Sequence, residues 1–233
     1  MISPTVFDPE EIDYFDIERQ HSHEFYVPVK GSKKRILSDL GPTNIHHVLY
    51  TRCLTYLDRK INAVDVGCRD GEFTRYLTWS FPHVYCFDYR RRPYFAGNVS
   101  LQAVTHYTVA LGANKSQELG SGRNNFRNPV FDAPYRIRKL KENTQDTILP
   151  LDSFQLPEVN LIKIDVDGME EEVLKGAVET LEKYQPVIVI EELIMANGVP
   201  NHGGIKFLSD LGYEQVFKIE SQKTHRDYIF IKK

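Results

Sequence analysis

The chain has 233 residues, of which 41% are hydrophobic and 26% are charged, and its formal net charge is -3 at pH 7. This composition is typical of one globular domain with a sizeable core, and the near-neutral charge excludes a global electrostatic attraction to nucleic acid. No apolar run approaches membrane-spanning length, and three cysteines without metal spacing favour a reducing compartment, so a cytoplasmic protein with no membrane partner is expected.

Breaks in the pattern predict how the chain is organised. Residues 1–42 mix acids, aromatics and prolines and are predicted to form an N-terminal extension. Residues 43–233 are predicted to form the main domain, beginning with a helix over 44–57 whose first-turn histidines, His46 and His47, are expected at the surface.

The rest of the domain alternates strand and helix patterns, which predicts a mostly parallel α/β sheet of Rossmann-like type. An insertion at about 113–145 has loop composition, and a long insertion in a compact domain is often a substrate loop. The last two predicted strands, 213–219 and 227–231, are joined by a short polar turn and read as an antiparallel hairpin. Such a closing hairpin is the usual plan of Rossmann-like methyltransferases.

A glycine turn follows the first predicted strand of the sheet. Asp65-Val-Gly-Cys-Arg-Asp-Gly71 lies between an apolar run and a helical pattern, where α/β sheets bind nucleotide-like ligands. Its D-x-G-x-x-x-G spacing differs from the G-x-G-x-x-G of dinucleotide-binding proteins. An acid at the strand end suits a ligand with a cationic part, such as S-adenosylmethionine. Gly67 and Gly71 are expected to let the backbone approach this cofactor, with Cys68 packed beside it.

A second acid supports a nucleoside site. Asp88 ends the next apolar run, about twenty residues downstream, which is the offset at which an acid holds ribose hydroxyls. Asp88 and the adjacent Tyr89 are therefore candidate cofactor contacts. The alternative for Asp88 is an ordinary cap or turn residue.

Further acids follow the fourth and fifth predicted strands. Asp165 and Asp167 end one strand and Glu191 ends the other, and parallel strands expose their carboxyl ends at one edge. These three residues, with His202 in the loop after the fifth strand, are the candidate catalytic groups. Asp165 or Asp167 could act as a base or bind Mg2+, or could cap the following helix instead. A lone loop histidine is more often exposed and inert.

Several separated blocks together resemble the FkbM-type methyltransferases over about residues 60–233. The resemblance implies a class I methyltransferase fold, S-adenosylmethionine as cofactor, and O-methylation of a hydroxyl on a small molecule or glycan. It also adds Phe73, Thr74 and Ala110 to the candidate cofactor contacts. The blocks are Asp65-Val-Gly67, Gly71-Glu-Phe-Thr74, Val109-Ala-Leu-Gly112, Leu151-Asp-Ser-Phe154, Asn160 to Glu170, Glu172 to Ala177, and Pro186 to Glu191.

Two other function classes remain open from the sequence. An RNA-modifying methyltransferase would use basic residues of the insertion to follow phosphates, although the neutral overall charge counts against it. The same guanidinium groups could select an anionic small acceptor. A non-catalytic cofactor-binding protein is the third class. The basic residues are Arg123, Arg127, Arg136, Arg138, Lys139 and Lys141.

Overall fold

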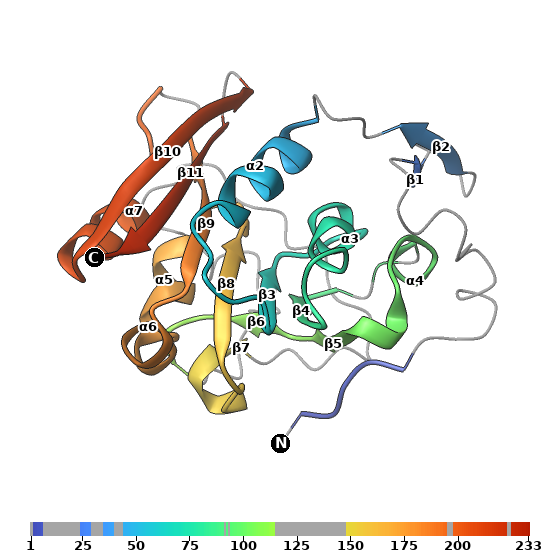
Figure 1. The fold of residues 1–233 in the computed structure, drawn as a ribbon, viewed down its shortest axis with the longest axis horizontal. Coiled ribbons are helices and arrows are strands. Elements are labelled where there is room, and N and C mark those ends of the chain that lie inside the picture. Colours follow the sequence, from blue (N-terminus) through green and yellow to red (C-terminus); the bar gives the residue numbers. More distant parts are fainter. Residues whose placement is uncertain are drawn as a thin grey trace, which may run out of the picture.

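A central seven-stranded sheet organises the chain (Figure 1). The computed structural model describes residues 2–6, 24–28, 35–39, 44–90, 92, 94–114, 148–194, 198–222 and 225–233. The strands of this sheet, in chain order, are β3 (Asn62–Val66), β4 (His83–Asp88), β5 (Val104–Thr108), β8 (Val159–Ile164), β9 (Val187–Leu193), β10 (Tyr213–Gln222) and β11 (His225–Lys232).

The order of strands across this sheet is β10-β11-β9-β8-β3-β4-β5. The strands from β9 to β5 pair in parallel, and β11 pairs antiparallel with both β9 and β10. Counting the seven strands along the chain, the order is 3-2-1-4-5-7-6, with the reversed strand inserted between the fifth and sixth. This order confirms the predicted Rossmann-like class I methyltransferase fold and its antiparallel end. The strand order reverses between β3 and β8, the position where sheets of this type bind ligands.

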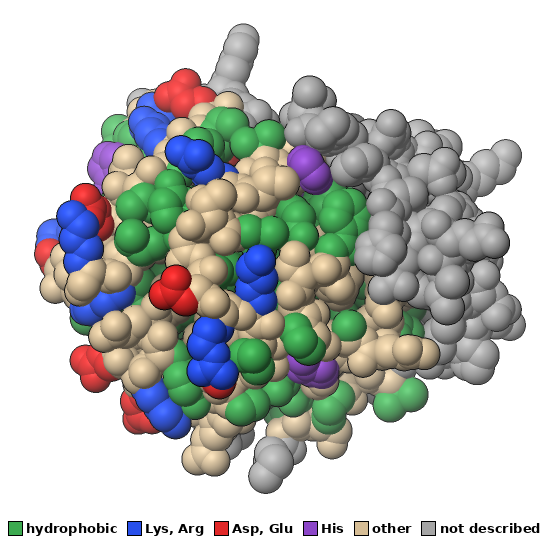
Figure 2. All heavy atoms as spheres, in the orientation of Figure 1, with side chains coloured by type: hydrophobic (Ala, Val, Ile, Leu, Met, Phe, Trp, Pro, Cys, Tyr) green, Lys and Arg blue, Asp and Glu red, His purple; other side chains and the backbone are tan. Residues whose placement is uncertain are grey.

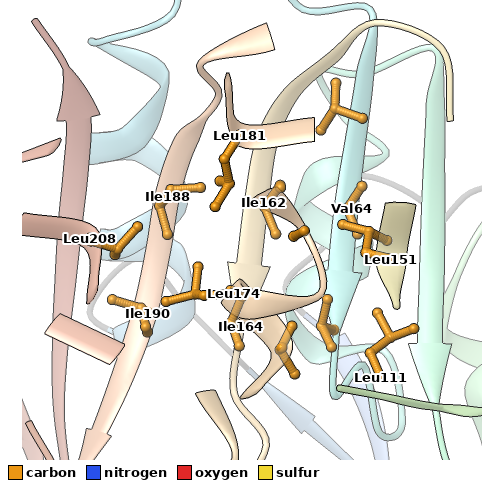
Figure 3. Close-up of a cluster of buried hydrophobic side chains, with 14 of the residues drawn as sticks. Val64, Leu111, Leu151, Ile162, Ile164, Leu174, Leu181, Ile188, Ile190 and Leu208 are labelled. Carbon is orange, nitrogen blue, oxygen red and sulfur yellow. The ribbon is translucent and has the colours of Figure 1, made fainter. Parts of the chain in front are cut away.

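Helices cover both faces of the sheet. The helices α2, α3 and α4 pack on one face, where Leu49 and Phe73 join the buried side chains of the strands. The helices α5, α6 and α7 pack on the other face, where Figure 3 shows Leu174, Leu181 and Leu208 against the strand residues. The helices are α2 (Ile45–Leu54), α3 (Glu72–Leu77), α4 (Phe95–Asn98), α5 (Glu170–Lys175), α6 (Val178–Tyr184) and α7 (Gly203–Asp210), with 3-10 turns η2 (Leu101–Ala103) and η3 (Leu151–Phe154).

Part of the predicted N-terminal extension lies against the main domain. The backbone amide of Thr5 donates to the carbonyl of His106 in β5 at 2.6 Å, and the hydroxyl of Thr5 lies 2.8 Å from that of Thr108. The extension also contains an antiparallel pair, β1 (Glu24–Pro28) and β2 (Arg35–Asp39). A parallel pair of short strands, β6 (Ala110–Leu111) and β7 (Ile148–Leu149), flanks the predicted insertion, most of which lies outside the described residues.

The chain between β8 and β9 forms two helices, α5 and α6, which are separated at Gly176. A Cβ at Gly176 would lie 2.1 Å from the carbonyl oxygen of Gly112, so this glycine allows two backbones to approach closely. The Asp152 carboxylate then caps α6 by accepting from the amides of Glu179 and Thr180 at 2.9 and 3.0 Å. No helix within the described parts of the chain combines the length and the apolar character needed to cross a membrane.

Candidate active site

The glycine turn after β3 contains three residues with positive φ angles and packs against the end of β8. Gly67, Arg69 and Gly71 have φ angles of 78°, 47° and 91°. A Cβ at Gly67 would lie 1.8 Å from the carbonyl oxygen of Asp165, at the end of β8. The missing side chain of Gly67 therefore makes room for the backbone at the end of the neighbouring strand, and its expected role in letting the cofactor approach stays a prediction. This contact joins the turn to the point where the strand order reverses.

Asp88 joins the end of β4 to the same turn. Its carboxylate accepts from the backbone amides of Arg69 at 3.0 Å and Arg90 at 2.8 Å, and it lies 3.6 Å from Nε of Arg92. Burial raises the pKa of Asp88, and the Arg92 guanidinium opposes that shift. The structure therefore brings Asp88 and the glycine turn together. It also shows that Asp88 has the turn-residue role given as its alternative, and contact with a ribose stays a prediction.

The buried ammonium group of Lys163 lies between two carboxylates near this turn, those of Asp65 and Asp165. Nζ of Lys163 in β8 lies 3.6 Å from Oδ1 of Asp65 and 3.1 Å from Oδ2 of Asp165. Thr74 completes the arrangement by donating its hydroxyl to Oδ2 of Asp65 at 2.6 Å. Burial alone would lower the pKa of Lys163, but the two carboxylates outweigh it and raise that pKa. Asp65 is thus engaged by Thr74 and Lys163, and its expected direct contact with the cofactor stays a prediction.

Glu191 and His46 lie beside the ionic row formed by Asp65, Lys163 and Asp165. Burial, followed by the neighbouring Asp165 carboxylate, raises the pKa of Glu191 to about 9. His46 in α2 packs edge-on against Phe73, with ring centroids 6.1 Å apart. Burial and then the Lys163 ammonium lower the pKa of His46 to about 4. His46 is therefore half-buried, with its Nδ1 enclosed, where a surface position was expected.

The turn after β8 is fixed by side chains from two elements. Asp167 and Gly168 have φ angles of 53° and 102°. Oε1 of Glu170 accepts from the amides of Val166 and Gly168 at 3.1 and 3.0 Å, and Nδ2 of Asn201 donates to the carbonyl of Gly168 at 3.2 Å. Burial raises the pKa of Glu170 to about 7 despite these amide donors.

The two acids after β8, either of which was a candidate base or Mg2+ ligand, have different partners. Asp165 is bonded to Lys163, whereas Asp167 gathers with Glu191 of β9 and His225 of β11. The ligand atoms of these last three side chains all lie within 4.8 Å of one another.

His202 occupies the N-cap position of α7 and contacts a buried acid. Its Nδ1 lies 2.5 Å from Oε1 of Glu192, which is buried in β9. Oε2 of the same carboxylate accepts from the Tyr228 hydroxyl at 2.8 Å and from Nη1 of Arg226 at 3.4 Å. Sequence reasoning selected His202 but missed Glu192 as its partner, because Tyr228 and Arg226 reach it only through the pairing of β9 with β11.

The remaining candidate cofactor residues fall into two groups. Cys68, Phe73 and Thr74 are buried, and burial raises the pKa of the Cys68 thiol well above its usual range, which argues against a reactive thiolate. Tyr89 and Ala110 are half-buried, and the Arg90 guanidinium lies 4.6 Å from the centre of the Tyr89 ring.

The basic residues considered for RNA or anion binding lie in the insertion, outside the described residues. On the described part of the face in Figure 2, charged side chains of both signs are interspersed with hydrophobic ones. That mixture does not form the one-sided basic footprint typical of nucleic-acid binding.

Several methyltransferases are among the solved structures to which the chain is similar. The methyltransferase FkbM from Methylobacillus flagellatus KT is 17% identical with a TM-score of 0.49, over 73% of this chain but only 43% of its own length. Precorrin-6y C5,15-methyltransferase from Geobacter metallireducens GS-15 is 14% identical with a TM-score of 0.48, over 89% of this chain and 94% of its own.

A third similar structure is the N-methyltransferase NodS from Bradyrhizobium japonicum WM9 in complex with S-adenosyl-L-homocysteine. It is 11% identical with a TM-score of 0.45, over 82% of this chain and 89% of its own. No curated protein sequence gives a significant match.

The family of the chain is shown by the match of its sequence to a family model. Residues 51–214 match the methyltransferase FkbM domain, a span that contains the glycine turn, Asp88, the Lys163 row and His202. This span is well over half of the chain, and the strand order agrees with a methyltransferase sheet. The chain therefore belongs to the FkbM methyltransferase domain family.

Proposed function

We propose that this protein transfers a methyl group from S-adenosylmethionine to a hydroxyl group of a small molecule or glycan. Family membership supports methyl transfer. The observation that carries the choice of a hydroxyl acceptor is the contact between His202 and the buried Glu192 at the carboxyl end of β9. Such a pair supplies a proton acceptor, which a weakly acidic hydroxyl needs more than an amine or a thiol does.

The residues at the end of β3 fit the cofactor. The glycine turn lies at the reversal of strand order, and Asp88 fixes the amide of Arg69 beside it. Asp88 and the turn would hold the ribose and the amino-acid end of the cofactor, in the positions usual for Rossmann-like sheets. When bound, S-adenosylmethionine supplies an electrophilic methyl group on a sulfonium.

In this proposal, Nε2 of His202 receives the proton of the acceptor hydroxyl. Because Glu192 accepts the hydrogen on Nδ1 of His202, Nε2 keeps a lone pair. Transfer of the methyl group to the acceptor oxygen would leave S-adenosylhomocysteine and would release the hydroxyl proton. The hydroxyl proton passes to Nε2 of His202. Most of the rate enhancement comes from alignment of the hydroxyl with the methyl group.

Cofactor binding is tested with S-adenosylhomocysteine by calorimetry. The wild type should bind it, and Asp88→Asn should bind it about 10- to 100-fold more weakly, since a hydrogen bond to a charged group contributes about 1.5–3 kcal/mol. Asp152→Asn is the matched control, because Asp152 lies in η3 and also accepts from two backbone amides, those at the start of α6. Absence of binding by the wild type would overturn the proposal.

The acceptor class is tested with radiolabelled S-adenosylmethionine against a panel of hydroxyl, amine and thiol compounds. Methyl transfer to hydroxyl compounds should be lost in His202→Ala while S-adenosylhomocysteine affinity is retained. Transfer to nitrogen or sulfur alone would disprove O-methylation.

A further inference from the structure

We propose that Asp167, Glu191 and His225 bind one divalent transition-metal ion at the acceptor end of the sheet. Three separate elements supply these side chains: the turn after β8, strand β9 and strand β11. One ligand atom from each lies within 4.8 Å of the other two. Only the role of the ion rests on the proposed function, whereas the binding site stands on the geometry alone.

The register of the sheet explains why the three residues meet. Asp227 of β11 pairs with Glu191 of β9, and His225 pairs with Leu193. His225 and Asp227 are two residues apart, so their side chains lie on the same face of the sheet as that of Glu191. Since β8 neighbours β9 in parallel, the turn that follows β8 brings Asp167 to this edge.

One oxygen of Glu191 has no hydrogen-bond partner among the described residues, although its carboxyl group also interacts with that of Asp165. This oxygen, Oε2, is completely buried. Oε1 of Glu191 lies 4.0 Å from Nε2 of His225, which is too long for a hydrogen bond. Atoms that bind one ion at roughly 2.0–2.2 Å lie about 3–4 Å from each other, so small side-chain rotations would close the site.

The turn that carries Asp167 is preorganised. Asp167 adopts a left-handed conformation that is uncommon for residues other than glycine, and Gly168 adopts another directly after it. Glu170 and Asn201 hold this turn from two sides. Strained backbone that is held in this way is typical of ligand sites, because binding then requires little reorganisation.

The ligand set defines the class of ion. Two carboxyl groups and one imidazole provide mixed oxygen and nitrogen donors, which suit Mn2+, Fe2+ or Zn2+ better than Mg2+. Three protein ligands leave open positions for water or for the acceptor hydroxyl. In the proposed reaction the ion would hold that hydroxyl and make its proton easier to remove.

The probe for this site is Mn2+, titrated into the chelator-treated full chain and followed by calorimetry and by electron paramagnetic resonance. One ion should bind per chain, and Glu191→Gln and His225→Ala should each weaken binding at least about tenfold. His83→Ala is the matched control, because this partly buried histidine lies at the amino end of β4 and contacts Thr105. Circular dichroism of each variant verifies that it is folded.

The outcomes separate the metal site from the proposed function. Loss of Mn2+ binding in the two site variants, with S-adenosylhomocysteine binding retained, supports the site. A wild type that binds Mn2+ but not S-adenosylhomocysteine also supports it, and overturns the proposed function instead. Absence of Mn2+ binding by the wild type, or equal affinity in all four proteins, overturns the site.

Discussion

Nδ1 of His202 lies 2.5 Å from Oε1 of Glu192, so a largely exposed imidazole at the start of α7 is held by a carboxylate buried in β9. A carboxylate accepts hydrogen bonds and cannot donate them, so Nδ1 of His202 must carry the hydrogen. We expect nitrogen-15 NMR of the neutral side chain to show the Nδ1–H tautomer, leaving Nε2 available as a base. Glu192→Leu should abolish this preference, whereas Tyr228→Phe should retain it. An Nε2–H tautomer in the wild type would contradict the assigned role of His202.

Gly67 and Gly198 provide a matched pair of substitutions, because their φ angles are 78° and 80°. An added Cβ would lie 1.8 Å from the Asp165 carbonyl at Gly67, whereas no described atom lies within 4 Å at Gly198. Gly67→Ala should reduce the free energy of unfolding by at least about 3 kcal/mol, through overpacking and left-handed strain together. Gly198→Ala should cost about 1 kcal/mol, from strain alone. Urea denaturation measures both, and equal costs would refute the close approach of β3 to β8.

The fold was predictable because the central parallel strands are short, mostly apolar runs that end at turn residues. All five residues of β3 are buried, and an apolar run bounded by a glycine turn indicates such a strand directly. The end of β9 was less clear, because Glu191 and Glu192 look like residues that follow a strand. β9 nevertheless continues through both glutamates to Leu193, because they pair with residues of β11. These paired residues are more than thirty positions apart in the sequence.

The site was predictable in its location but not in its contacts. The acids at the strand ends do meet at one edge of the sheet, as parallel pairing requires. The sequence did not identify Lys163 as a site residue. Its role depends on ion pairs with Asp65 on the adjacent strand and with Asp165, and these contacts are visible only in the folded structure. The close contact of Gly67 could not be foreseen for a similar reason: its neighbour is a carbonyl about a hundred residues away in sequence.

Glu170 should make stability depend on pH. Burial raises its folded pKa to about 7, above the ordinary value of 4.5. Between these values the folded state holds a proton that the unfolded state has lost, so the stability from this group is present below pH 4.5 and is lost as the pH rises through 7. A shift of this size corresponds to a difference on the order of 3 kcal/mol.

The test compares the wild type with Glu170→Gln, which stays neutral and keeps an oxygen for the amides of Val166 and Gly168. The variant should gain unfolding free energy relative to the wild type between pH 4.5 and pH 8, as measured by urea denaturation. Glu182→Gln on the exposed side of α6 controls for the loss of a surface carboxylate. A constant difference between Glu170→Gln and the wild type across this range would show that Glu170 has the same pKa in the folded and unfolded states.

Lys163 should be the most sensitive charged residue of the site. It is buried between Asp65 and Asp165, so Lys163→Met would leave two carboxylates without a cation and should cost about 3–5 kcal/mol of unfolding free energy at neutral pH. Lys175→Met is the matched control, because Lys175 also bridges two acids, Glu171 and Glu172, but at the surface. It should cost less than about 1 kcal/mol.

A double variant separates the loss of charge compensation from the loss of packing at Lys163. Asp65→Asn removes one of the two buried charges and keeps an oxygen for the Thr74 hydroxyl, which donates to Asp65 at 2.6 Å. Adding Asp65→Asn to Lys163→Met should therefore recover part of the lost stability, even though both single variants destabilise the protein. If the double variant is less stable than Lys163→Met alone, then Lys163 stabilises the protein through packing of its side chain. The buried ion pair would then not be what stabilises the carboxyl ends of β3 and β8.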